Sequence, residues 1–186
     1  MFNPTLTEEE KILVKSLSKQ KKMRGQGKVK VYFNKSKGDG KGGTYYTGTF
    51  HSKKSHGSFT YRSSYELRHF INLENDPKVV SFHSEIMEVP YKDSKNKNRV
   101  YIPDLVVVYE DGKIEIHEIK PKAMLQDVDV QKKAQACRAF ATKTFEQKVR
   151  YKFITEAELF STNKEYIDFI NNVCKKWNKG KWTMMH

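Results

Sequence analysis

Two carboxylates and one lysine are the side chains of this sequence whose types and spacing could do chemistry. Asp104 follows a proline, and Glu118, Ile119 and Lys120 come one after another further along the chain. If Glu118 and Lys120 lie in a strand, its alternation places both on one face, with Ile119 on the other. Pro121 cannot donate the next ladder hydrogen bond, so we expect the strand to end there with both polar side chains at the rim of the sheet.

Asp104 is expected to meet Glu118 across a hairpin. An Asp111-Gly112 pair separates two strand-like runs, and this pair suits the positive φ of a tight turn. Asp104 and Glu118 lie about equally far from the turn along the two strands, so their carboxylates should share one end of the hairpin. Pro103 marks a break or bulge immediately before the paired segment.

This grouping favours a phosphodiester hydrolysis site. Two close carboxylates repel each other, and one has a raised pKa unless a cation neutralises the pair. Oxygen ligands suit Mg²⁺ or Mn²⁺, which keep waters and accept phosphate oxygens as further ligands. Lys120 could hold the attacking water or counter the charge that grows on the phosphate. The alternative is a half-solvated strand, but charges at the end of an otherwise buried face are costly unless they are used.

Glu66 is a third acid with two interpretations. Ser63 and Glu66 have the spacing of a capping box, in which the glutamate needs no catalytic role. The residues alone favour the helix cap.

The elements that must position these residues mix strands and helices. A hairpin or meander is expected over 44–60, and helical spacing over 67–73 predicts a helix that stops at Asp76-Pro77. Strand character follows at 79–82, 86–91, 100–109 and 113–119, then a helix at 128–144, a strand at 149–153 and a last helix at 166–177. Before them, a capped helix is expected from Thr7 and a glycine-rich loop over 25–43. The order predicts an α/β body with a mixed central sheet.

The Pro103-Asp104 pair with Glu118-Ile119-Lys120 resembles the PD-(D/E)xK signature of the restriction-endonuclease-like superfamily. From Thr60 to Leu159 the order and spacing of motifs is similar to TnsA-type transposon-end endonucleases and to the head-completion nucleases of tailed phages. The motifs are Tyr61 to Glu66, Val79 to Phe82, Val89 to Tyr91, Tyr101 to Asp104 and Glu118 to Lys122.

The resemblance implies a restriction-endonuclease-like core, a four-stranded mixed sheet flanked by helices, and Mg²⁺-dependent DNA cleavage. It assigns catalytic roles to Glu66, Asp104, Glu118 and Lys120, with the three acids as metal ligands. It thereby reverses the preference for a simple cap at Glu66. A TnsA-type enzyme works with a transposase partner, and the choice between transposon-end cleavage and phage head completion stays open.

Positive charge is concentrated near the N-terminus. The 186 residues include 35 Lys and Arg against 22 Asp and Glu, and 14 of these bases lie in 11–62 beside one acid, Asp39. A basic arm suits DNA, because neutralising phosphates releases counterions, whereas a solubilising tail is the alternative. The residues expected to bind nucleic acid are Lys21, Lys22, Arg24, Lys28, Lys30, Lys53, Lys54, Arg62 and Lys122.

The length suits one core, so we expect a basic extension at 1–59 and a nuclease core at 60–186. No apolar run approaches the length of a bilayer span, and the two cysteines show no metal-binding spacing. We therefore expect a cytoplasmic protein, found in the infected host or the virion if a phage encodes it. A homodimer suits double-strand cutting. The alternative function is a non-catalytic DNA-binding or virion-assembly protein that keeps the nuclease fold.

Overall fold

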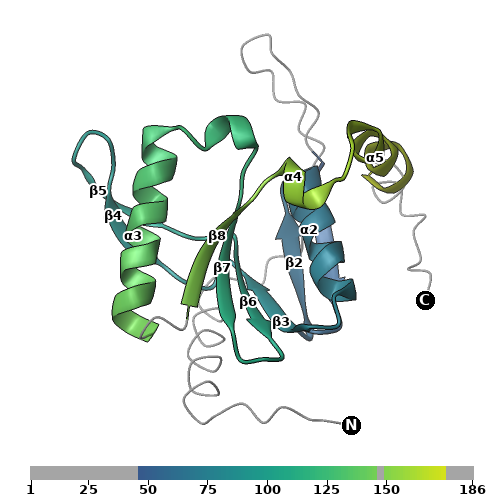
Figure 1. Cartoon of the computed structure of the whole chain (residues 1–186), viewed down its shortest axis with the longest axis horizontal. Coiled ribbons are helices and arrows are strands. Elements are labelled where there is room, and N and C mark those ends of the chain that lie inside the picture. Colours follow the sequence, from purple (N-terminus) through teal and green to yellow (C-terminus); the bar gives the residue numbers. More distant parts are fainter. Residues whose placement is uncertain (1–45, 146–148, 175–186) are drawn as a thin grey trace.

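The computed structural model describes residues 46–145 and 149–174, and a four-stranded mixed sheet lies at its centre (Figure 1). The strands lie in the order β3, β6, β7, β8, and only the β7–β8 pair is parallel. Their bounds are β3 Val79–Ser84, β6 Leu105–Tyr109, β7 Ile114–Ile119 and β8 Val149–Ile154. This confirms the predicted α/β fold with a mixed central sheet.

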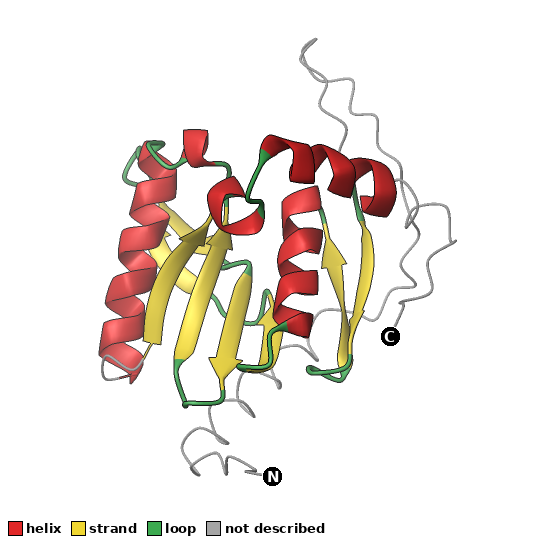
Figure 2. Cartoon of the chain, turned by 45° about the vertical axis from the view of Figure 1, so that its right-hand side comes forward, coloured by secondary structure: helices red, strands yellow, loops and turns green. Residues whose placement is uncertain are grey.

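Helices cover the two faces of this sheet. Helix α2 (Ser64–Asn75) lies on one side and helix α3 (Val128–Phe145) on the other (Figures 1 and 2). Helix α2 begins at the predicted cap, Ser63, and ends before Pro77. Its buried apolar residues recur every three positions, which gives the helix one face toward the core.

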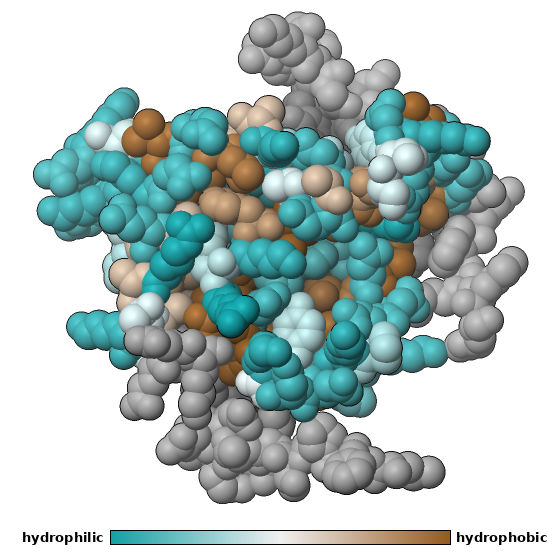
Figure 3. Space-filling model, in the orientation of Figure 1, coloured by the Kyte–Doolittle hydropathy of each residue, from teal (hydrophilic) through white to brown (hydrophobic). Residues whose placement is uncertain are grey.

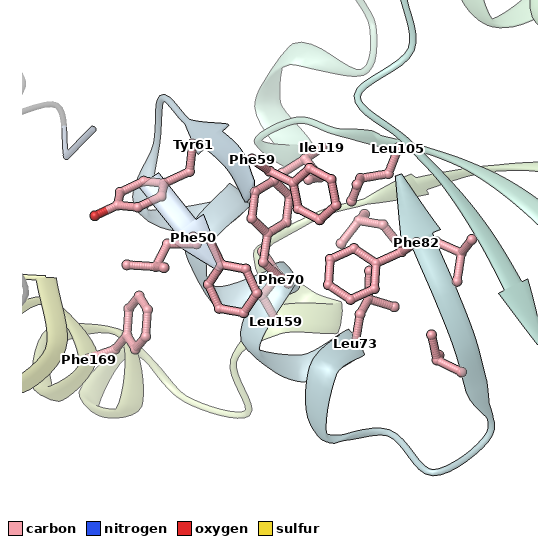
Figure 4. Packing of buried hydrophobic residues seen from close by; sticks show 14 of the residues in the cluster. Phe50, Phe59, Tyr61, Phe70, Leu73, Phe82, Leu105, Ile119, Leu159 and Phe169 are labelled. Carbon is pink, nitrogen blue, oxygen red and sulfur yellow. The ribbon is translucent and has the colours of Figure 1, made fainter. Parts of the chain in front are cut away.

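A hairpin of β1 (Gly48–Ser52) and β2 (Gly57–Tyr61) packs beside α2, which confirms the hairpin predicted over 44–60. Phe50 and Phe59 of the hairpin contact Phe70 of α2 edge to face, with ring centroids 5.7 and 5.9 Å away (Figure 4). Phe50 and Phe59 therefore share a hydrophobic cluster with residues of α2 and of the central sheet. The rest of the predicted extension, with its helix and glycine-rich loop, lies outside the described residues, and the boundary at 59 stays a prediction.

A second hydrophobic cluster fills the space between the sheet and α3. Val106 and Val108 of β6 and Ile116 of β7 lie there with Cys137 and Ala141 of α3. The intervening residues of the same strands face α2. Because both faces are covered, β6 is apolar almost throughout.

The structure divides the strand predicted over 100–109. Asn98–Tyr101 forms β5, which pairs with β4 (Val89–Lys92) in a separate two-stranded sheet, and β6 starts after Pro103. Proline has no N–H for a ladder, so the predicted break falls here. The strand expected over 86–91 is correspondingly shorter and never joins the central sheet.

The last predicted helix also differs. Helix α5 (Asn163–Phe169) passes into a π-helical segment, η3 (Ile170–Cys174), and residues beyond 174 lie outside the described part. Two single-turn elements, η2 (Lys122–Met124) and α4 (Glu156–Leu159), are too short for a periodic pattern to indicate them. Within the described ranges, no helix has the length and apolarity needed to cross a bilayer.

Candidate active site

Asp104 and Glu118 lie at the same end of the β6–β7 hairpin, as the sequence predicts. Leu105 pairs with His117 at this end, so Asp104 and Glu118 occupy the next position of the register. Asp104 Oδ2 accepts a hydrogen bond of 2.7 Å from the Ile119 N–H. The turn at the other end closes through Gly112, whose φ of 79° is the left-handed value expected there.

The backbone of Asp104 is held from a second side. Its carbonyl accepts a hydrogen bond of 3.1 Å from the N–H of Glu85, which follows β3. Glu85 has a φ of 53°, a conformation that is uncommon for a residue with a side chain. Asp104, the residue before β6, is therefore held by hydrogen bonds from Ile119 of β7 and from the residue that follows β3.

Glu118 is a buried carboxylate on the face of the sheet that α3 covers. Its side chain is only 5 % exposed. The hydroxyl of Tyr101, the last residue of β5, donates to Glu118 Oε2 at 2.5 Å. The ammonium of Lys120 lies 3.0 Å from Glu118 Oε1. Both carboxylate oxygens therefore have a donor, and the predicted meeting of Glu118 and Lys120 is found.

The electrostatics of this group leave more negative than positive charge. Burial first, and then the Glu118 carboxylate, raise the pKa of Asp104 to about 7. Burial alone would lower the pKa of Lys120, but the carboxylates of Asp104 and Glu118 outweigh it and raise that pKa. Lys120 thus stays a cation, and this one cation lies near two carboxylates, the buried Glu118 and the half-buried Asp104.

Glu66 caps helix α2, as its spacing from Ser63 indicates. The Ser63 hydroxyl accepts from the Glu66 N–H at 3.1 Å, and Glu66 Oε2 accepts from the Arg62 N–H at 2.9 Å. Burial raises the pKa of Glu66, while the hydrogen bonds that its carboxylate accepts from the Arg62 N–H and the Ser63 hydroxyl, and the charges of Arg62 and Lys120, oppose that shift. Glu66 therefore lies within electrostatic reach of Lys120 while serving as a cap.

The donors at this site fit a hard divalent cation held by two carboxylates. Mg²⁺ commonly binds through one or two carboxylates and fills its other positions with water or phosphate oxygens. Asp104 and Glu118 supply such oxygens, and the raised pKa of Asp104 indicates that their repulsion is only partly neutralised. Across residues 46–145 and 149–174, no three His, Cys, Asp or Glu side chains are grouped so that they could hold one ion. A third ligand at Glu66 stays a prediction.

The structure separates the residues predicted to bind nucleic acid. Arg62, which pairs with Glu85 at 2.6 Å, and the exposed Lys122 lie beside the site. Lys54 instead donates to the Leu73 carbonyl at 3.1 Å and to the Asp76 carbonyl, at the end of α2 far from Glu66. Lys53 lies in the same turn. The other predicted residues, Lys21, Lys22, Arg24, Lys28 and Lys30, lie outside the described ranges.

Sequence reasoning missed Tyr101, whose only signal is its place three residues before Asp104. His117, the neighbour of Glu118 in β7, points instead to the α2 face. His117 Nδ1 lies 2.9 Å from His69 Nε2, and His117 Nε2 lies 2.8 Å from Glu115 Oε2. Burial lowers the pKa of both imidazoles, that of His69 to about 3. This network connects α2 to β7.

Residues 76–156 match the family model described as TnsA-like endonuclease N terminal. The matched stretch contains Asp104, Glu118 and Lys120 and begins after Glu66. The match confirms the predicted resemblance to TnsA-type endonucleases over these residues. No curated protein matches the chain.

Proposed function

We propose that this protein, with its TnsA-like domain, is a metal-dependent DNA endonuclease that hydrolyses phosphodiester bonds. One observation carries the proposal. The half-buried carboxylate of Asp104, the buried carboxylate of Glu118 and the Lys120 ammonium lie together at one end of β7, inside the residues that match the endonuclease family. Buried charges that exceed their partners are costly to retain unless a ligand uses them.

Each residue of the site has a defined task. Asp104 and Glu118 hold Mg²⁺ or Mn²⁺, and Glu66 is the third proposed acid. A bound divalent ion would offset the two carboxylates and polarise a phosphate oxygen. Lys120, whose side chain is 27 % exposed, can donate to the nucleophilic water or to the phosphate. The Tyr101 hydroxyl and the Ile119 N–H fix the two carboxylates in place.

The substrate is DNA, in duplex or branched form. The TnsA-like match favours cleavage at transposon ends together with a transposase partner, and head completion in a tailed phage is the alternative process. A homodimer would bring two sites to the two strands, because one site of this kind cuts one strand. The enzyme would then act in the cytoplasm or, if a phage encodes it, in the infected host or the virion.

Metal-dependent cleavage assays test the assignment. Supercoiled plasmid and branched DNA are incubated with Mg²⁺, Mn²⁺ or EDTA and with wild type, Asp104→Ala, Lys120→Ala or the control Lys113→Ala, at an exposed position near the turn end of the β6–β7 hairpin. We expect the first two variants to lose at least about 10²-fold in rate while binding DNA as before, because each lost contact acts on the transition state. Lys113→Ala should cut at nearly the normal rate.

Cleavage by Asp104→Ala or Lys120→Ala at the wild-type rate contradicts the assignment. DNA binding without metal-dependent nicking by the wild type would support the alternative, a non-catalytic DNA-binding protein. The same assay separates the two roles of Glu66. Glu66→Gln should slow cleavage more than Ser63→Ala, which removes the cap and should cost about 1 kcal/mol of unfolding free energy.

A further inference from the structure

The β4–β5 hairpin presents a basic surface that the proposed site does not use. Lys92, Lys95, Lys97 and Arg99 are all exposed. The one acid in this stretch, Asp93, is buried in the turn, where it accepts hydrogen bonds from the Lys95 and Lys97 N–H groups and from Arg99 Nε. The outward charge of the hairpin is therefore positive.

This hairpin is fixed to the body of the protein. The Ser94 N–H donates to Asp129 Oδ1 at 2.6 Å, and the Lys132 ammonium donates to the Asp93 carbonyl at 2.9 Å. Both partners belong to the first turns of α3, beside which the hairpin lies (Figure 1). That side of the molecule is mostly hydrophilic (Figure 3). The lysines are thus held at a set position rather than on a long free loop.

The hairpin is also connected to the proposed site by a hydrogen bond. Strand β5 ends at Tyr101, whose hydroxyl donates to Glu118. Lys97 lies four residues earlier, which corresponds to about 13 Å of extended strand. A DNA strand advances about 3.4 Å per nucleotide, so this distance corresponds to about four base pairs.

We propose that the β4–β5 hairpin binds the phosphate backbone of the substrate duplex, about four base pairs from the phosphate that is cut. The inference rests on the proposed function, because it takes DNA as the substrate. Lysines that contact phosphates give salt-dependent affinity without sequence preference and set the position of the duplex. None of Lys92, Lys95 and Lys97 forms an ion pair with an acid in the described ranges, so their charges are available.

Two triple variants of the full chain test the proposal. The hairpin variant carries Lys92→Gln, Lys95→Gln and Lys97→Gln. The control variant carries Lys78→Gln, Lys113→Gln and Arg150→Gln, which remove the same charge from exposed positions at the opposite end of the central sheet. Because Asp93 binds backbone N–H groups of the turn, the hairpin substitutions leave its hydrogen bonds intact. Equal melting temperatures check this point.

Affinity for a duplex is measured by fluorescence anisotropy in EDTA over a series of salt concentrations. The hairpin variant should bind on the order of tenfold more weakly, and its log–log salt slope should flatten by about one for each lysine removed. The control variant should keep nearly the wild-type slope. Equal changes in the two variants would overturn the proposal, as would a wild type that does not bind DNA.

This readout is independent of cleavage. A wild type that binds but never cuts refutes the enzyme while the comparison of the two variants still tests the hairpin. A wild type that cuts while both variants bind alike refutes the hairpin and leaves the enzyme standing. The two failures are therefore distinguishable.

The expected distance has its own test. Cys137 and Cys174, the two cysteines of the chain, are buried, so Lys97→Cys provides one exposed thiol for a tethered iron chelate. The chelate should cut the duplex about four base pairs from the cut made by the enzyme itself. Scission spread evenly along the duplex would overturn the assigned position.

Discussion

Strand β7 carries a group of hydrogen-bonded polar side chains on each of its two faces. Toward α2, Glu115 accepts from His117, and His117 contacts His69. Toward α3, Glu118 meets Tyr101 and Lys120. Side chains alternate between the two faces of a strand, so neighbouring residues of β7 belong to different groups. Both groups are buried and hydrogen-bonded, and hydrogen bonding alone does not tell a structural network from a site.

The direction of the pKa shifts does distinguish them. On the α2 face, the hydrogen bond from His117 lowers the pKa of Glu115, so the carboxylate is stabilised by what surrounds it. Near the α3 face, burial and the charge of Glu118 raise the pKa of Asp104. The charge of Glu115 is thus compensated by its protein neighbours, whereas Asp104 and Glu118 retain negative charge that a bound cation would neutralise.

The largest difference in cleavage rate is expected between substitutions of the two glutamates on opposite faces of β7. We expect Glu118→Gln to lower the metal-dependent cleavage rate by at least about 10²-fold, because it removes a charge from the group that would hold the ion. Glu115→Gln, three residues away on the other face, should keep the rate within a few-fold of wild type. Plasmid nicking with both variants at the same protein concentration is the measurement, and similar losses in the two would remove the distinction between the faces.

A smaller difference in cleavage rate is expected between substitutions of two buried tyrosines. The Tyr101 hydroxyl holds Glu118, whereas the Tyr61 hydroxyl has no hydrogen-bond partner in the part of the chain that the structure describes. Tyr101→Phe should slow cleavage by roughly 10-fold, because groups that orient a metal ligand have effects of this size. Tyr61→Phe should leave the rate unchanged and should not lower the free energy of unfolding, because it removes a buried unpaired hydroxyl.

Steady-state rates and urea unfolding of the two phenylalanine variants measure this contrast. A rate loss for Tyr61→Phe as large as that for Tyr101→Phe would mean that the effect comes from general disturbance of the core. An unchanged rate for Tyr101→Phe would mean that Glu118 does not need this orientation.

The histidine pair should affect stability rather than rate. His69→Leu leaves the buried Nδ1 of His117 without its partner and should cost about 1–3 kcal/mol of unfolding free energy at pH 7. In the wild type, the native pKa of His69 is lowered to about 3, below the ordinary value of 6.5. Below pH 6.5 the unfolded state therefore binds a proton that the native state does not, and stability falls as the pH is lowered toward 3.

Chemical unfolding between pH 7 and pH 4 measures this dependence. His69→Leu should give a flatter curve than the wild type, because the proton uptake of the unfolded His69 is gone. His51→Leu, at an exposed position of β1, should keep the wild-type curve. If the unfolding free energy of His69→Leu falls with pH as steeply as that of the wild type, the histidine pair does not control the sensitivity to acid.

The approach of Asp104 to Glu118 could be derived from sequence because it depends on local geometry. Alternation along β7 and a tight turn at Gly112 fix the register of one hairpin. The cap of α2 at Ser63 is equally local, since it involves residues three apart. Glu66 shows the limit of such reasoning, because a helix cap and a metal ligand would both be a glutamate at this position, and the sequence does not distinguish them.

Tertiary structure alone decided what surrounds these residues. Tyr101 reaches Glu118 only because Pro103 ends pairing and turns β5 into a separate sheet against α3. His69 and His117 meet because α2 packs on one face of β7, although 48 positions separate them in the chain. Local propensity and spacing determine which groups a strand or cap presents. Their partners are chosen by packing between distant segments, which maximises buried apolar area and leaves no trace in the spacing of residues.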